Sequence, residues 1–160
     1  MTSISTFQRD QKALRTQQKA LNAQFAAKVT LEGGGGTFDA ATFLPVDPRT
    51  RGYAVAIRPD LEMTIPVHSG FLGHTAFYNS AENIAQELVN YSDLIPSGTF
   101  VGTWFDTEAH VFVFDAIVIL RDYDDAMTVA KALGQKAIWD FGLKTELAVE
   151  PATRADRPAL

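Results

Sequence analysis

The amino-acid sequence predicts an α+β protein: a mixed, largely antiparallel sheet with two covering helices, preceded by a long N-terminal helix on a glycine linker. Three patterns lead to this prediction. Four segments alternate apolar and polar residues with the period of a strand, two short amphipathic segments carry helix caps, and the N-terminal segment repeats apolar residues at helical spacing. We expect an N-terminal helix in residues 1–32, a Gly/Pro linker arm in 33–51, a globular domain in 52–149 and a flexible tail in 150–160.

The N-terminal segment, residues 5–29, has the pattern of one amphipathic helix. Its apolar residues recur at intervals of seven and four and form a narrow stripe: Phe7, Leu14, Leu21, Phe25 and Val29. So thin a stripe suits one groove or one partner helix, and an isolated helix of this length is marginal in water. The stripe therefore predicts packing on the chain's own domain, self-association or docking onto another protein. We expect a contact outside the globular domain.

Four successive glycines, Gly33–Gly36, follow the helix. They lack the Lys-Ser/Thr ending of a phosphate-binding loop and no strand precedes them, so they predict a flexible linker. Beyond them, the segment 38–51 contains two prolines and predicts an irregular arm, which Phe38, Phe43 and Leu44 anchor to the core.

The elements predicted for the globular domain are, in chain order, strands at 53–58 and 61–65, a loop at 67–78, a helix at 79–91, strands at 99–105 and 111–120, a helix at 123–134, and strands at 136–141 and 147–149. Pro59-Asp60 predicts that the first two strands form a hairpin, and the polar segment 106–110 predicts a second hairpin. The aromatic and β-branched strand at 111–120 is typical of a central strand.

Both predicted helices of the globular domain have recognisable ends. Asn79 with Glu82, and Asp122 with Asp125, have the spacing of N-terminal caps, and Gly134 ends the second helix. The cluster of Asp122, Asp124 and Asp125 also invites a magnesium interpretation, but capping and the favourable helix dipole account for it without an ion.

The composition and charge of the chain exclude several classes of function. The chain has 160 residues, of which 46% are hydrophobic and none is cysteine, so a single domain without thiol catalysis, iron–sulfur clusters or thiolate zinc sites is expected. A net charge of −5 with scattered basic residues argues against nucleic-acid binding, and dispersed acidic residues argue against an acidic DNA mimic. No apolar run reaches the roughly 18–20 residues that span a bilayer, and no export signal is visible. We expect a cytoplasmic protein with neither nucleic acid nor membrane as partner.

One set of motifs resembles a known family. The segments are Gly102-Thr-Trp-Phe-Asp106, Phe112-Val-Phe-Asp115, Arg121-Asp-Tyr-Asp-Asp-Ala126 and Gly134-Gln-Lys-Ala-Ile-Trp-Asp140. They resemble a small domain in uncharacterised proteins of actinobacterial phages, prophages and mobile elements, over roughly residues 52–149. The resemblance implies a phage or mobile-element setting, in the host cytoplasm or a virion, and brings no catalytic residue.

Candidate metal and catalytic residues are sparse. His110 with Asp106 and Glu108 could hold a metal at a hairpin turn, but the histidines lack the spacing of a known metal motif, and a solvated turn is the simpler interpretation. His68 and His74, in a loop rich in glycine and aromatic residues, offer a site for a small hydrolase. Ser69 beside His68 lacks a nucleophile elbow.

No pair of carboxylates stands out among Asp106, Glu108, Asp115 and Asp140, so no glycosidase-type site is predicted either. We expect no catalytic residue, no metal and no cofactor. Trp104 and Trp139, on short strands, join the N-terminal stripe as candidate contact residues. The sequence favours a non-enzymatic phage or mobile-element protein that acts through protein–protein contacts, as a virion component or as an accessory factor binding a host protein. A small hydrolase with a site at the His68–His74 loop is the alternative.

Overall fold

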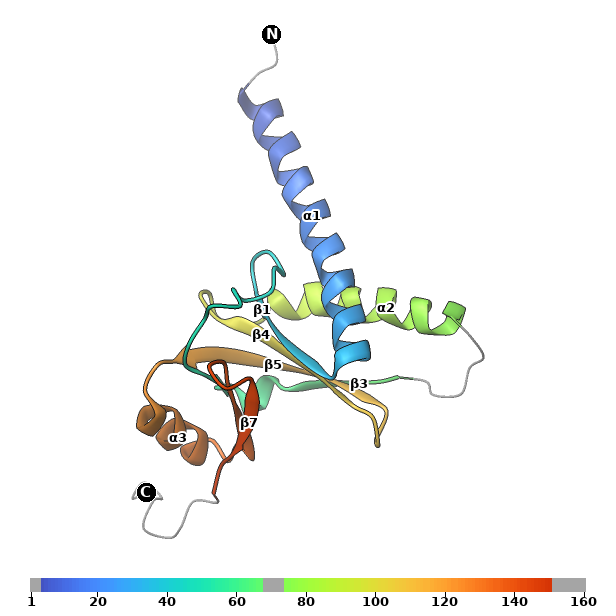
Figure 1. Ribbon diagram of the computed structural model, residues 1–160. Helices are drawn as coiled ribbons and strands as arrows, with labels where there is room; N and C mark the ends of the chain where they lie inside the picture. Colours follow the sequence, from blue (N-terminus) through green and yellow to red (C-terminus); the bar gives the residue numbers. More distant parts are fainter. Residues whose placement is uncertain (1–3, 68–73, 151–160) are drawn as a thin grey trace.

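Figure 1 shows the computed structural model of the chain, which describes residues 4–67 and 74–150, with side chains for 4–67 and 81–150. The elements in chain order are α1 (Ile4–Gly33), β1 (Gly35–Asp39), β2 (Tyr53–Ala56), the 3₁₀ turn η1 (Pro59–Leu61), β3 (Met63–Pro66), α2 (His74–Ser92), β4 (Phe100–Asp106), β5 (Val111–Leu120), α3 (Tyr123–Ala132), β6 (Ala137–Asp140) and β7 (Thr145–Ala148). The predicted tail lies outside the described residues, apart from its first residue.

The strands form one sheet in the order β1-β4-β5-β2-β6-β7, with β3 also paired to β5. Every pair that the described strands form is antiparallel. The predicted α+β class with a long helix before a largely antiparallel sheet is confirmed. β5 lies centrally, between β4 on one edge and β2 and β3 on the other, as its aromatic and β-branched residues predict.

The hairpin predicted for 53–58 and 61–65 is wrong. β2 and β3 do not pair with each other; both pair with the same edge of β5, Tyr53 opposite Leu120 and Met63 opposite Phe114, and both run antiparallel to it. The physical reason lies in η1, which starts at Pro59. This single turn lifts the chain away from β5 and returns it in its original direction, so the two strands form one interrupted strand.

The helices cover one face of the sheet. Successive residues of β5 alternate between the faces. Phe112, Phe114 and Ala116 belong to the larger core cluster beneath α1 and α2, whereas Val118 and Leu120, on the same face, pack against the smaller cluster beneath α3. The twist of the sheet separates the two clusters, so α3 lies well away from α1 and α2 in Figure 1. The opposite face carries no helix in the described part of the chain.

α1 enters the core by a face that the apolar stripe does not include. Its buried residues are Ala23, Ala26, Ala27, Thr30 and Leu31. The hydroxyl oxygen of Thr30 lies 2.6 Å from that of Thr103 on β4, in a buried hydrogen bond. By contrast, every residue of the segment 4–18 is exposed, and Figure 1 shows this part of α1 projecting from the body of the molecule. Its 15 residues extend about 22 Å.

The glycines after α1 differ from the expected flexible linker. Gly35–Asp39 forms β1, paired with β4, and the amide of Gly34 donates to the Thr30 carbonyl 2.8 Å away. Gly34 has φ +94°, a conformation that favours glycine, and a Cβ on Gly35 would lie 3.1 Å from the Thr103 carbonyl oxygen. The glycines therefore make a tight turn and a close strand contact.

The remaining predictions for the arm and the helices have mixed outcomes. Phe38 and Phe43 are buried and anchor the arm as predicted, but Leu44 is exposed. α2 begins at His74 and not at Asn79, so Asn79 is not its cap. Asp122 does cap α3: its carboxylate accepts from the Asp125 amide at 2.9 Å. The strands predicted at 136–141 and 147–149 correspond to β6 and β7, which pair as an antiparallel hairpin. Most of the predicted 67–78 loop lies outside the described residues or within α2.

Gly52 offers a test of the junction between β2 and β5. It has φ +111°, and a Cβ there would lie 2.6 Å from the backbone oxygen of Leu120. Gly98 has φ +82° but open space around it. Gly98→Ala should therefore cost only backbone strain, about 1 kcal/mol, whereas Gly52→Ala should cost about 2–4 kcal/mol because the strand must also shift. Urea denaturation measures both, and equal losses would contradict this description of the junction.

Candidate functional site

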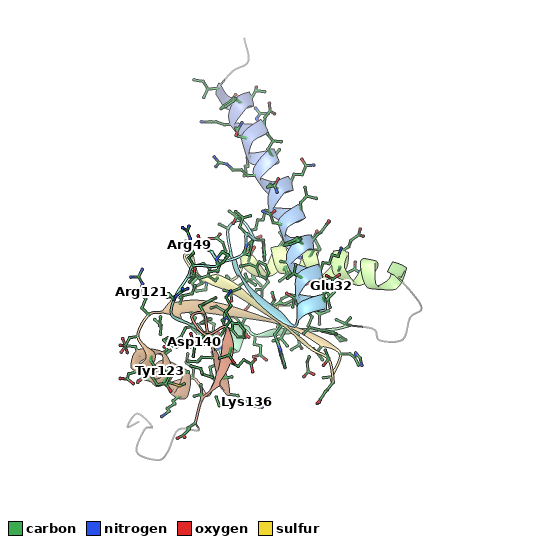
Figure 2. The ribbon with its side chains drawn as sticks, viewed as in Figure 1. Glu32, Arg49, Arg121, Tyr123, Lys136 and Asp140 are labelled. Atoms are coloured by element: carbon green, nitrogen blue, oxygen red, sulfur yellow. The ribbon has the colours of Figure 1, made fainter. Side chains whose placement is uncertain are left out.

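The first candidate surface is an apolar stripe along α1, which we call the outer stripe: Ile4, Phe7, Leu14, Leu21 and Phe25. At 100° per residue these side chains lie on the side of the helix opposite to the buried alanine face. The helix therefore has two apolar sides, of which the domain uses only one. Figure 2 shows the side chains of the projecting part standing clear of every other element.

The exposed fractions show how little of the outer stripe the chain itself covers. They are 79% for Ile4, 62% for Phe7, 59% for Leu14, 52% for Leu21 and 58% for Phe25. Four of these five residues were predicted; Ile4 was missed, although it lies one helical turn before Phe7. Val29, the last predicted residue of the stripe, is partly buried. Single exposed apolar residues are ordinary, whereas five on one side of one helix make this stripe a candidate interaction surface.

The second candidate surface is the sheet face without helices, which we call the open face. It is hollowed into a cavity of about 600 Å³. The lining includes Trp104 of β4, Asp115 of β5, Trp139 of β6, and Phe25 and Val29 from the base of α1. The cavity thus brings together four of the predicted contact residues, whereas Phe7, Leu14 and Leu21 lie on α1 away from it.

The two tryptophans lie at opposite ends of the open face. Trp104 pairs with Val113, near the start of β5, whereas Trp139 pairs through Ala54 with Ile119 near its end. Trp104 is 47% exposed and Trp139 is 38% exposed, so each indole presents apolar surface to the cavity. They are therefore two separate aromatic positions and not one aromatic cluster.

Asp115 is the unusual titratable group of the open face. Burial, followed by the negative charge of Glu62 and a hydrogen bond with it, raises the pKa of Asp115 to about 6. Glu62 follows the η1 turn, and the strand interruption between β2 and β3 lies opposite Asp115. The sequence alone gave no signal for this pair, because the two residues are far apart in the chain and meet only through the pairing with β5.

Two of the other candidate acidic residues, Asp106 and Asp140, accept hydrogen bonds from nearby backbone amides. The carboxylate of Asp106 accepts from the amides of Glu108 and Ala109, both at 2.9 Å. That of Asp140 accepts from the amides of Gly142 and Leu143 at 2.8 and 3.0 Å. These hydrogen bonds fix turns, as the Asp122 cap fixes a helix start.

The histidines singled out in the sequence are only partly covered by the described residues. Among the side chains described, those of residues 4–67 and 81–150, no group of three or more possible metal ligands is present. His110 lies in the β4–β5 turn with φ 53°. His68 and Ser69 lie outside the described residues, and His74 is the first residue of α2 with its side chain not described. The alternative of a hydrolase at this loop stays a prediction.

Comparisons of the chain with protein-family models, with curated proteins and with solved structures found no match. Among the helices that the structure describes, none has the length and apolar character needed to cross a membrane. By its fold, the chain is an α+β protein in which a long helix projects from an antiparallel sheet.

The Asp115 carboxyl predicts a pH dependence of stability. Its pKa is about 6 in the folded state and 3.8 in the free residue, so folding takes up a proton between these values. Below about pH 4 the carboxyl is protonated in both states, and burying it costs no charge. Above about pH 6 folding must bury the ionised carboxylate at its full free-energy cost, so the free energy of unfolding should fall as pH rises through this window. Asp115→Asn should remove the slope and gain about 1–3 kcal/mol at pH 7.

Glu146→Gln is the matched control, because Glu146 is an exposed carboxylate that lines the same cavity. Chemical denaturation from pH 4 to pH 7 measures the slope of each variant. A slope that survives Asp115→Asn, or that disappears with Glu146→Gln, would contradict the assignment.

Proposed function

We propose that the protein is not an enzyme and acts through protein–protein contacts, with the outer stripe of α1 as its contact surface. The observation that carries the proposal is that every residue of the helical segment 4–18 is exposed, beyond the part of α1 that packs on the domain. A helix of this length is marginal in water by itself, so a partner along the stripe would stabilise it.

The energy available to such a contact is substantial. Burying an apolar side chain of this size completely contributes about 1.5–3 kcal/mol, and more than half of each side chain of the outer stripe remains exposed. Five such residues therefore offer several kcal/mol, less the entropy of ordering the two partners. This is a sufficient driving force for a specific contact.

A phage or mobile-element setting fits this function. Its support is the resemblance of the segments 102–106, 112–115, 121–126 and 134–140 to the domain described above. In that setting the protein is a virion component, or an accessory factor that binds a host protein in the cytoplasm.

Leu14→Asp with Leu21→Asp tests the contact surface. The pair should lower association at least tenfold, because two charges would enter the apolar contact, and should change the free energy of unfolding by less than about 1 kcal/mol, because both side chains are exposed. Ala13→Asp with Ala20→Asp is the matched control: it adds the same charge at the same spacing to exposed positions on another side of α1.

Association is read in the cells that naturally make the protein, with the photoreactive residue para-benzoylphenylalanine at position 14 or, as control, at position 13. Position 14 should yield a covalent protein adduct, and the Asp pair should be compared by co-purification of the same partner. If position 14 gives no more protein adduct than position 13, the stripe is not a contact surface. If the Asp pair unfolds the whole chain without changing association, the stripe belongs to the core.

A further inference from the structure

We propose that the occupant of the outer stripe is a second copy of this chain, paired with the first in parallel and in register along α1. This inference rests on the proposed function and names its partner. The contact would be a short two-stranded coiled coil that holds two globular domains at one end.

The spacing of the outer stripe is that of a coiled-coil seam. Steps of three and four residues alternate without a break over seven positions: Ile4, Phe7, Gln11, Leu14, Gln18, Leu21 and Phe25. In heptad terms the first, third, fifth and seventh are a positions and the others d positions. The seam covers three heptads and about 30 Å of helix.

The domain leaves this seam free. The buried residues of α1, among them Ala23, Ala26 and Thr30, fall at heptad positions b, c, f and g, on the other side of the helix. The seam is therefore exposed both where α1 projects and where it packs on the domain, down to Phe25. The next seam position is the exposed Lys28, which would meet its own copy, so the apolar contact ends where the globular domain begins.

The two glutamines select the parallel orientation. In a parallel pair in register, a positions meet a positions, so Gln11 and Gln18 each face their own copy, and the two amides can donate to and accept from each other. In an antiparallel pair, a positions face d positions, and the glutamines of the projecting parts would face Phe or Leu. Burying an amide against an apolar side chain without a hydrogen bond costs free energy, so the antiparallel pair is disfavoured.

The charges beside the seam agree with this choice. Asp10 lies at a g position and Arg15 at the e position of the next heptad, which are adjacent across a parallel coiled coil. Both residues are exposed, and neither belongs to the three ion pairs that the described residues form within the chain. A parallel dimer would gain two Asp10–Arg15 pairs between the copies, which favours its register more than its affinity.

Analytical ultracentrifugation of the purified full chain tests the dimer directly. The chain, of 17.5 kDa, should show a reversible equilibrium between this mass and twice this mass. Leu14→Asp with Leu21→Asp should shift the midpoint at least tenfold in concentration toward the monomer, whereas Ala13→Asp with Ala20→Asp should leave it within about twofold. Circular dichroism and thermal unfolding of each variant confirm that the domain is folded.

The absence of cysteine from the chain makes the orientation testable by disulfide formation. Gln11→Cys should form a disulfide-linked dimer under mild oxidation, since the two thiols would be adjacent in a parallel pair. Thr16→Cys, at the exposed f position, is the matched control and should form at least tenfold less. An antiparallel pair would instead link Gln11→Cys to Leu14→Cys when the two variants are mixed.

Each result has a separate meaning. A concentration-dependent dimer with the Gln11→Cys disulfide supports the inference. A monomer at every concentration, or the mixed Gln11→Cys and Leu14→Cys disulfide, overturns it. If the purified chain is monomeric but position 14 crosslinks to a different protein in cells, the inference fails and the proposed function stands. If position 14 crosslinks to no protein, both fail.

Discussion

The packing of the alanine face of α1 is the contact on which the rest of the molecule depends. Ala23, Ala26 and Ala27 are fully buried in the cluster shared with α2 and the sheet, and the Thr30–Thr103 hydrogen bond ties the same face to β4. Small side chains let the helix approach its neighbours closely. Because the domain packs against the alanine face of α1, the larger side chains on the opposite side, such as Leu14 and Phe25, are exposed.

The turn after α1 fixes the direction of the helix relative to the sheet. Gly34 closes the helix with φ +94°, and Gly35–Asp39 pairs at once with β4, so α1 is joined to the sheet without a free linker. Lys19 adds contacts at the base, 3.8 Å from the Asp93 carboxylate and over the Phe43 ring. A helix held in one direction presents its surface with less loss of entropy on binding than a tethered helix would.

The sequence predicted what local patterns determine and missed what distant contacts determine. The β-branched and aromatic residues of 99–105 and 111–120, around the polar segment 106–110, predicted the central hairpin, and Asp122 predicted the start of α3. The interrupted strand was missed because a proline turn can reverse a chain or return it to its course, and only pairing with β5 decides. The buried face of α1 was missed because alanine contributes little to a hydrophobic pattern, so the larger residues dominated the prediction.

Residue-resolved hydrogen exchange along α1 tests whether one side of the helix packs in the domain while the other side binds a partner. Amides of residues 23–31 should be protected like the core strands at every protein concentration, since their helix turns are packed in the domain. Amides of 4–18 should exchange fast in dilute protein and become protected as concentration rises. Fast exchange in 23–31, or core-like protection of 4–18 at the lowest concentration, would contradict the account.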